Sequence, residues 1–330
     1  MKSRAVSFEA PARIRHVDVE LPAPAHDEVV VRTLFSGISA GTELLAYRGE
    51  VDPQLPLDES IGSLGGTFEY PFRYGYSCVG RVEASATPEH RDALVFAFHP
   101  HQERFVVPWR DVVPLESVDP RTATLFPLLE TAFQACLDAG QVYADSVVVS
   151  GLGPLGLLTA GLLARAGARV IGAEPRLWRR DVAAAFGIDA VSPEELAAEV
   201  ARRSEGRGVP LLVEASGRPE ALASGLPLLA HEGTALVLSW YGTKEVSLPL
   251  GAAFHRRRLT LRSTQVTSIP AAMADRWNVT RRRAAVRALL TTLPLQTLAS
   301  HTFPFERAVD AFAALDRGEE GLVHAALCYG

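Results

Sequence analysis

The sequence predicts an α/β protein in which a doubly wound parallel sheet is inserted into a β-rich domain. First, the apolar run 146–150 ends on a glycine-rich turn that passes directly into a helical pattern. Second, strand-like and helical segments alternate from Thr124 onward, which is typical of a parallel sheet with crossover helices. Third, residues 1 to about 120 contain short strand-like runs separated by Pro, Gly and acidic turns.

The N-terminal part predicts strands and shows no helical period. Residues 1–9 alternate apolar and polar side chains, as a half-buried strand does, and lack the apolar core of a signal peptide. Further strands are expected at residues 29–34, 79–83, 94–98 and 104–108.

A G-x-G-x-x-G turn follows the strand 146–150. It consists of Gly151, Leu152, Gly153, Pro154, Leu155 and Gly156. The first glycine permits a tight turn, the second leaves room for phosphates, and the third lets the helix pack closely on the strand. Pro154 suits a first helical turn, where no N–H is needed. The turn therefore predicts a binding site for a dinucleotide pyrophosphate, the alternative being a glycine-rich turn without a ligand.

An acidic residue ends the next strand, 169–173. Glu174 lies 23 residues after Gly151, close to the spacing of about 20 at which a carboxylate reaches the ribose hydroxyls. A carboxylate repels a 2′-phosphate, so the sequence favours NAD. Arg176, Arg179 and Arg180 follow, and they either clamp a phosphate or form the solvated start of a helix over 178–186. NADP thus stays possible, with Arg179 as a candidate contact.

Three later strands are expected at residues 211–215, 235–239 and 259–263. Ligands of open α/β sheets bind at the carboxyl edge, where these strands end. The candidate cofactor-binding residues there are Ser216, Ser239, Trp240 and Thr264. Packing in a cleft or at a dimer interface is the alternative for Trp240. Two helices, 281–291 and 306–316, and a strand, 322–329, complete the chain.

Composition narrows the function classes. The 330 residues suffice for two domains, and a net charge of −5 gives no footprint for nucleic acid or an anionic membrane surface. The three cysteines lie far apart without C-x-x-C spacing, which suits a reducing cytoplasm. No apolar run is long enough to cross a bilayer. We expect a cytoplasmic protein that acts on a small molecule.

Two N-terminal motifs carry a family resemblance. Residues 36–43, Ser-Gly-Ile-Ser-Ala-Gly-Thr-Glu, resemble the segment that reads C-G-x-C-x-T-D in zinc alcohol dehydrogenases, and residues 75–82 resemble G-H-E-x-x-G-x-V. With the order of its parts, the chain resembles the medium-chain dehydrogenase/reductase superfamily, and within it the bacteriochlorophyllide hydroxyethyl dehydrogenases. The resemblance implies a GroES-like catalytic domain at 1–123, a Rossmann domain at 124–265, a C-terminal return to the catalytic domain at 266–330, and a homodimer.

The chain departs from that family at its zinc ligands. Ser39 stands where the family has its first cysteine ligand, and Tyr76 and Ser77 stand where it has histidine and glutamate. The third ligand position falls within 128–136, where Glu130 or Cys136 alone cannot hold a metal. The four cysteines of a structural zinc lobe are also missing. The sequence therefore predicts that neither zinc site is present.

The resemblance places Ser39, Thr42, Tyr76 and the loop 98–102 in the catalytic cleft. Tyr76 is a candidate proton donor to a carbonyl oxygen, the alternative being an aromatic side chain that fills the volume of the lost metal. Within the loop, His99 or His101 is a candidate general base, the alternative being a histidine bonded to backbone.

Thr42 occupies the position of the family's proton-relaying hydroxyl. Three residues later the chain has Leu45, so the usual relay histidine is missing. Glu43 is expected to pair with an arginine beneath the site. These residues favour a zinc-independent dehydrogenase or reductase that interconverts a secondary alcohol and its ketone with NAD(H). The alternatives are a reductase of activated C=C bonds and a nucleotide-binding partner or redox sensor without catalysis.

Overall fold

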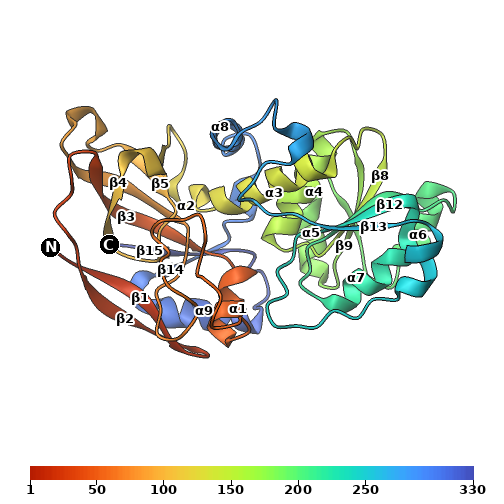
Figure 1. Ribbon diagram of the computed structural model, residues 1–330, viewed down its shortest axis with the longest axis horizontal. Helices are drawn as coiled ribbons and strands as arrows, with labels where there is room; N and C mark the ends of the chain where they lie inside the picture. Colours follow the sequence, from red (N-terminus) through yellow and green to blue (C-terminus); the bar gives the residue numbers. More distant parts are fainter. The chain divides into compact units, whose positions relative to one another are not determined.

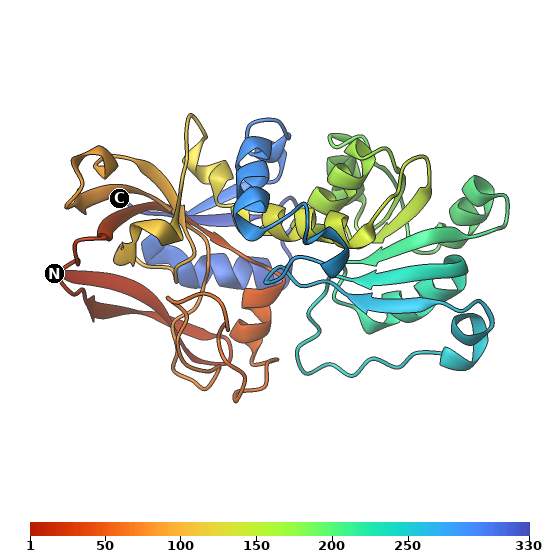
Figure 2. The same cartoon turned by 45° about the horizontal axis from the view of Figure 1, so that its top comes forward.

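The computed structural model describes all 330 residues, which divide into two compact units (Figure 1). The first comprises Met1–Pro127 and Arg287–Gly330, and the second comprises Leu128–Val286. Both chain ends lie in the first unit (Figure 2). No helix is both long and apolar enough to span a membrane.

The second unit is built on a six-stranded sheet in which every pair of neighbours is parallel. The strand order is β10-β9-β8-β11-β12-β13, which is the Rossmann order 3-2-1-4-5-6 in chain sequence. The strands are β8 (Ser146–Ser150), β9 (Arg169–Ala173), β10 (Asp189–Val191), β11 (Val209–Glu214), β12 (Leu229–Val237) and β13 (Thr260–Ser263). All of β8 is buried, as expected of a central strand with both faces covered.

Six helices lie wholly or mostly in the second unit, and most of them flank this sheet (Figure 1). They are α3 (Phe126–Ala139), α4 (Pro154–Arg165), α5 (Leu177–Ala184), α6 (Leu196–Ser204), α7 (Pro219–Gly225) and α8 (Val279–Leu289). Apolar side chains of α6 and α7, such as Val200 and Leu222, form one cluster with the sheet residues Val148, Ile171 and Leu212. The expected α/β class with a doubly wound parallel sheet is confirmed.

The first unit contains the β-rich part. A seven-stranded sheet has the order β14-β15-β3-β4-β5-β7, with β6 also paired to β3, and β1 and β2 form a separate antiparallel pair. The strands are β1 (Lys2–Ala10), β2 (Arg13–Glu20), β3 (Glu28–Ile38), β4 (Cys78–Ser85), β5 (Leu94–Ala97), β6 (Arg104–Pro108), β7 (Val112–Pro114), β14 (His301–Pro304) and β15 (Ala325–Cys328). The long strand β3 pairs with β4, β6 and β15 and so joins both chain segments of the unit.

Three helices belong to this unit, namely α1 (Thr42–Arg48), α2 (Pro120–Ala123) and α9 (Ala308–Arg317). Helix α9 buries its apolar side, and Phe312 packs edge-on against Phe8 of β1 at 5.4 Å. Helix α1 ends at Gly49, whose φ of 73° suits glycine. The sequence showed no helical period here, because seven residues are two turns and all but the ends of α1 are buried.

A buried ion cluster joins α3 to α8 inside the second unit. Arg282, 2% exposed, donates through Nε and Nη2 to one oxygen of Glu130 and through Nη1 to Gln134 at 2.6 Å. Arg283 also donates to Glu130, at 3.2 Å. The predicted boundary after residue 265 therefore falls before the boundary between the compact units, because this cluster holds α8 in the second unit. The assignment of the three segments as domains stays a prediction.

Substitution of Arg282 by Met is expected to destabilise the second unit by about 3 kcal/mol, because Glu130 stays buried with one half-exposed partner. Substitution of Arg283 by Met is the matched control and should cost less, since Arg282 retains its bonds. Differential scanning calorimetry of the two variants measures the difference. Equal losses of melting temperature would contradict the energetic role given to Arg282.

Candidate functional site

Three hydroxyl side chains come together in the first unit. Ser39 follows β3, Thr42 begins α1, and Tyr76 precedes β4. The Tyr76 hydroxyl interacts with the hydroxyls of Ser39 and Thr42. Burial raises the pKa of Tyr76, and the nearby charge of Glu43 raises it further. Tyr76 is thus a protonated hydrogen-bond donor at neutral pH, and the structure unites three of the five predicted catalytic residues.

Glu43, the residue that follows Thr42, is fully buried. Its Oε1 accepts the backbone N–H of Ser39 at 2.9 Å, and its Oε2 lies 2.7 Å from Nε2 of His101. We expected an arginine as the partner of Glu43, and that expectation is wrong. The loop after β5 brings a histidine instead, whose imidazole fits against Gly75, where a Cβ would lie 2.7 Å from the ring.

The two candidate bases have different surroundings. His101 is 0% exposed, and its Nδ1 lies 2.7 Å from the Ser36 hydroxyl, so both ring nitrogens are engaged. His99 stacks on Phe105 at 4.0 Å, and its Nδ1 lies 3.0 Å from the Pro100 carbonyl oxygen. Burial lowers the pKa of His99 to about 4, so the imidazole is neutral at pH 7. His99 forms no hydrogen bond with the hydroxyl cluster.

The donor set at the family's zinc positions does not fit zinc. Ser39 and Tyr76 offer hydroxyls, and Ser77 donates its hydroxyl to the Thr124 carbonyl at 2.7 Å. Structural and catalytic zinc sites use thiolates, imidazoles and carboxylates, and no group of three such side chains forms in the structure. Glu130 is held by arginines, and burial raises the pKa of Cys136 to about 12, which disfavours a thiolate.

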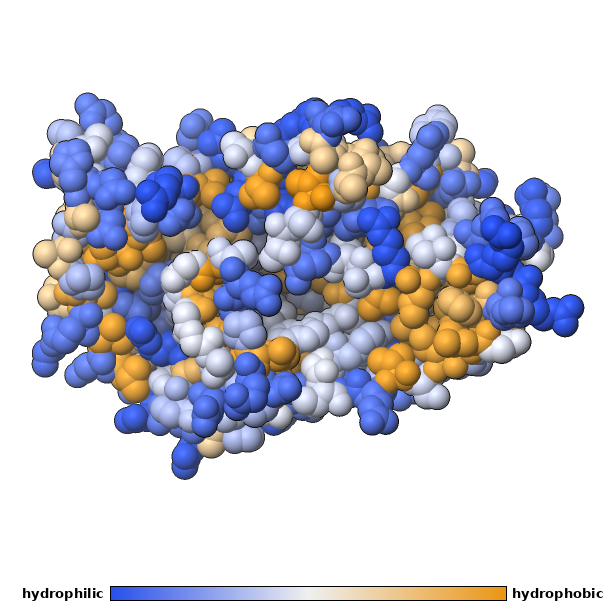
Figure 3. Space-filling model, in the orientation of Figure 1, coloured by the Kyte–Doolittle hydropathy of each residue, from blue (hydrophilic) through white to orange (hydrophobic).

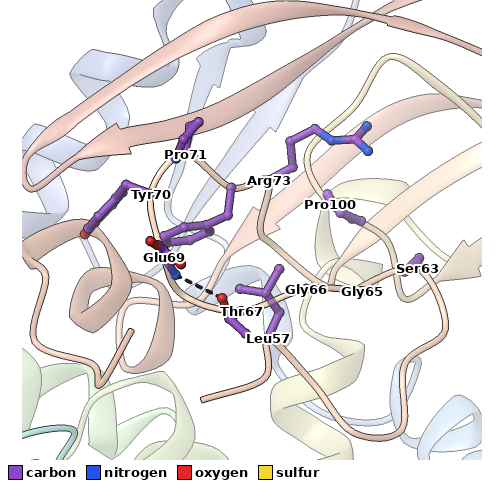
Figure 4. A pocket seen from close by; sticks show the side chains of 11 residues that line it. Leu57, Ser63, Gly65, Gly66, Thr67, Glu69, Tyr70, Pro71, Arg73 and Pro100 are labelled. Atoms are coloured by element: carbon purple, nitrogen blue, oxygen red, sulfur yellow. Dashed lines mark hydrogen bonds between the residues drawn. The ribbon is translucent and has the colours of Figure 1, made fainter. Parts of the chain in front are cut away.

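A shallow groove of about 420 Å³ lies elsewhere in the first unit, between the loop 57–73 and Pro100 (Figure 4). Tyr70 and Glu69 line it on one side and Ser63 on the other, and the Thr67 hydroxyl accepts the Glu69 N–H at 3.4 Å. Of the residues predicted for the catalytic cleft, only Pro100 of the loop 98–102 lines this groove.

The glycine-rich turn of the second unit has the geometry that a dinucleotide needs. Gly151 has φ 92°, and a Cβ there would lie 2.6 Å from the Ser216 backbone. A Cβ on Gly156 would collide with the Gly151 carbonyl. A Cβ on Gly153 would meet no atom within 4 Å, so that side of the turn is open. Gly153 is the N-cap of α4, and Pro154 and Leu155 follow in its first turn. These residues fit a bound pyrophosphate.

Glu174 lies beside the same turn. Its Oε2 accepts the N–H of Leu152 at 3.0 Å, and its Oε1 accepts the N–H of Arg176 at 3.1 Å. Arg179 is 3.8 Å from the carboxylate, and burial lowers the pKa of this arginine despite that attraction. Arg180 donates to the carbonyl oxygen of Glu174 at 2.7 Å. Two of the three arginines, Arg179 and Arg180, therefore interact with Glu174 in place of binding a 2′-phosphate.

The remaining strand ends divide into two sets. Ser216 and Ser239 lie near one another, since the Ser239 hydroxyl accepts the N–H of Gly217 at 2.8 Å. The Thr264 hydroxyl instead donates to Asp138 of α3 at 2.6 Å, which ties β13 to that helix. Trp240 is 40% exposed.

A buried carboxylate at this edge was missed by the sequence reasoning. Glu214, 0% exposed, accepts the Ser216 hydroxyl at 2.5 Å and the Tyr241 hydroxyl at 2.7 Å. Burial and this hydrogen bond raise the pKa of Tyr241. The sequence does hold a signal for this residue, because Glu214 is an acidic residue at the end of an otherwise apolar strand.

Known proteins match this chain over most of its length. A family model described as zinc-binding dehydrogenase matches residues 154–280. The L-threonine 3-dehydrogenase of Pyrococcus horikoshii is 37% identical over 258 residues, which are 69% of this chain and 73% of that protein. This chain belongs to the medium-chain dehydrogenase/reductase superfamily. The 2-desacetyl-2-hydroxyethyl bacteriochlorophyllide A dehydrogenase of Cereibacter sphaeroides is 26% identical over 338 residues, 95% of this chain and 94% of that protein.

The fold agrees with this membership. The alcohol dehydrogenase of Thermus sp. ATN1 superposes with a TM-score of 0.76 at 23% identity, covering 99% of this chain and 100% of that one. The family resemblance and the Rossmann and GroES-like folds are thereby confirmed. This medium-chain dehydrogenase is an NAD(P)-dependent enzyme, so the alternative of a partner without catalysis is set aside.

Substitution of Gly153 by Ala is expected to leave the melting temperature unchanged, because the added methyl meets no protein atom. It should weaken NADH binding on the order of tenfold or more, since it fills the space proposed for the phosphates. Titration calorimetry measures the affinity. Gly251→Ala is the matched control, because its Cβ also meets nothing. Unchanged affinity in Gly153→Ala would place the pyrophosphate elsewhere.

Proposed function

We propose that this dehydrogenase is a zinc-independent enzyme that interconverts a secondary alcohol and its ketone with NAD(H). The observation that carries the proposal is the hydroxyl cluster of Ser39, Thr42 and Tyr76, in which Ser39 and Tyr76 stand at positions where the family has zinc ligands. The names of the relatives are consistent with a secondary alcohol, because L-threonine 3-dehydrogenase and L-galactonate-5-dehydrogenase are named for internal carbon positions.

Tyr76 is the proposed proton donor during ketone reduction. When bound, the nicotinamide supplies the hydride. Tyr76 donates a hydrogen bond to the carbonyl oxygen and transfers its proton as the alkoxide forms, while Ser39 and Thr42 orient its hydroxyl. The raised pKa keeps this phenol protonated before transfer, and alcohol oxidation requires that Tyr76 first loses this proton. His99 and His101 are not placed in contact with the substrate in this proposal.

NAD is the proposed cofactor. Glu174 keeps free lone pairs on a carboxylate that already lies against the glycine-rich turn. That carboxylate accepts hydrogen bonds from the hydroxyls of a ribose diol, and its negative charge repels a 2′-phosphate. Leu152, Ser216, Ser239 and Trp240 are proposed to line the remainder of the dinucleotide site. Thr264 has a mainly structural bond to Asp138.

The experiment that tests the function measures NADH and NADPH oxidation with matched panels of ketones and enones. The protein is analysed for zinc by mass spectrometry and assayed with and without a chelator. We expect ketone reduction with NADH as the preferred cofactor, retained in the chelator. Turnover of enones alone would favour C=C reduction. Stoichiometric zinc, lost together with activity, would overturn zinc independence.

Substitution of Tyr76 by Phe is expected to lower kcat by about 10²-fold or more, because it removes the proposed proton donor. NADH affinity should stay unchanged. Tyr74→Phe is the matched control, since its ring packs edge-on against Tyr76 at 6.0 Å without joining the hydroxyl cluster. Full activity of Tyr76→Phe would assign the proton transfer to another group.

We also propose a homodimer formed through β13. All four residues of this edge strand are exposed, and Leu261 is 40% exposed. Figure 3 shows apolar surface over this part of the second unit. An open edge presents unpaired N–H and C=O groups that a second copy can pair. Leu261→Asp should yield monomers in light scattering, while the control Val309→Asp, also at an exposed apolar residue, should not. A monomeric parent protein would contradict the dimer.

The proposed location is the cytoplasm. All three cysteines are free thiols in the structure, and two of them are half-buried. Free thiols without disulfides suit a reducing compartment.

A further inference from the structure

A buried carboxylate lies at the carboxyl end of β11 with neutral hydrogen-bond donors around it. Glu214 is 0% exposed and pairs in register with Ser150, the last residue of β8. Its Oε1 accepts the Ser216 N–H at 2.7 Å and the Ser216 hydroxyl at 2.5 Å. Its Oε2 accepts the Tyr241 hydroxyl at 2.7 Å. Because every donor is neutral, the cluster keeps the negative charge of the carboxylate.

The directions of these bonds identify Glu214 as ionised. A backbone N–H can only donate, so the Ser216 N–H needs an acceptor. The Ser216 hydroxyl accepts the N–H of Arg218 at 3.1 Å, which leaves its own proton for Glu214. A protonated carboxyl group would place one more donor where the donors already converge.

The other buried carboxylates of the second unit have cationic partners. Arg282 and Arg283 donate to Glu130, and Arg179 lies 3.8 Å from Glu174. A buried charge is costly when no opposite charge compensates its loss of water. Glu214 forms no ion pair, so its charge acts on whatever lies at this edge of the sheet.

The turn that follows Glu214 contacts the glycine-rich turn. A Cβ on Gly151 would lie 2.6 Å from the Ser216 backbone, and a Cβ on Gly156 would lie 3.5 Å from the Ala215 Cβ. Strands β8 and β11 are also the neighbours between which the strand order of the sheet reverses. Open α/β sheets bind a dinucleotide in the crevice at this point. Glu214 therefore lies at the edge of the proposed dinucleotide site.

The topology tells which half of the dinucleotide lies on this side. Each half of a Rossmann sheet binds one mononucleotide. Glu174 follows β9, so the half formed by β8, β9 and β10 takes the adenosine in the proposed site. The half formed by β11, β12 and β13 is left for the nicotinamide nucleotide. Glu214 ends the first strand of that half, and Tyr241 follows the second.

The nicotinamide ring changes its charge in the reaction. The oxidised ring carries one positive charge, and the reduced ring is neutral because a hydride has been added to it. A fixed negative charge attracts the oxidised ring and has little effect on the reduced ring. Salt screens a buried charge much less than an exposed one, so this attraction persists at physiological ionic strength.

We propose that Glu214 sets the preference of this enzyme for the oxidised cofactor through its charge. Ser216 and Tyr241 hold the carboxylate in place, and the carboxylate does not touch the ring. The enzyme thus binds NAD⁺ more tightly, relative to NADH, than it would with a neutral residue at this position, which favours alcohol oxidation. The proposal rests on the dinucleotide site proposed above and is independent of the choice between ketone and enone substrates.

Other charged groups at the same edge of the sheet are exposed. Lys244 donates to the Gly217 carbonyl oxygen at 3.4 Å, and Arg218 and Glu220 lie at the start of α7. Exposed charges are screened over a Debye length of about 10 Å at 0.1 M salt. Their contribution is therefore smaller than that of the buried carboxylate.

The test measures the dissociation constants of NAD⁺ and NADH for the full-length enzyme by titration calorimetry. Glu214→Gln removes the charge with little change of shape. Its amide oxygen accepts from Ser216, and its amide nitrogen faces the Tyr241 hydroxyl oxygen. Glu220→Gln is the matched control, because it makes the same chemical change at an exposed carboxylate whose charge also reaches Tyr241.

The charge predicts that Glu214→Gln raises the dissociation constant of NAD⁺ on the order of tenfold and changes that of NADH by less than about twofold. Glu220→Gln should leave the ratio of the two constants unchanged. Glu214→Met combined with Tyr241→Phe removes both partners of one bond and is a second neutral form. It should give the same ratio as Glu214→Gln, also where one of the two variants folds poorly.

Two results would overturn the role of Glu214. An unchanged ratio in the neutral forms would show that the charge does not reach the ring. Equal losses of affinity for NAD⁺ and NADH would show that Glu214 only maintains the shape of the turn.

The outcome is separable from that of the proposed function. Binding is measured without a substrate, so the panel of ketones and enones does not enter. An enzyme that prefers NADPH is tested with NADP⁺ and NADPH, whose nicotinamide halves are the same. Weakened NADH binding in Gly153→Ala, together with an unchanged ratio in Glu214→Gln, would overturn the charge effect and leave the dinucleotide site in place.

Discussion

The hydrogen bond between Glu43 and His101 is the constraint on which the catalytic unit depends. A fully buried carboxylate is costly unless its oxygens have donors. Glu43 obtains one donor from the backbone of Ser39, at the end of β3, and the other from the loop after β5. The carboxylate therefore fixes the turn before α1 against that loop. The hydroxyls of Ser39 and Thr42 owe their position to this turn.

The parts predicted well from sequence are those with local causes. The strands 146–150, 169–173 and 104–108 match β8, β9 and β6 residue for residue. Buried parallel strands are continuous apolar runs, and glycine is needed where Gly151 adopts a positive φ. Glu174 follows from the same local geometry, because a fixed strand-helix-strand unit returns the chain beside the turn.

The parts that sequence could not supply depend on pairing between distant residues. His101 and Glu43 are 58 positions apart, and Arg282 and Glu130 are 152 positions apart. The local sequence around these residues does not indicate which histidine or arginine pairs with which carboxylate. Both histidines of the loop 98–102 were equivalent candidates in sequence, and only packing makes one a buried bridge and the other a stacked neutral ring.

In the proposed zinc-independent enzyme, hydroxyls in place of a metal change what the catalytic unit must do. A zinc ion stabilises an alkoxide by its charge, so the alkoxide does not need a proton as soon as it forms. A hydroxyl cluster brings no net charge, and here a buried carboxylate lies behind it, so a persistent alkoxide would be repelled. The negative charge on the substrate oxygen therefore has to be neutralised by a proton as it develops. This requirement explains why a protonated tyrosine suits the site, and why the supply of protons to that tyrosine matters as much as its own position.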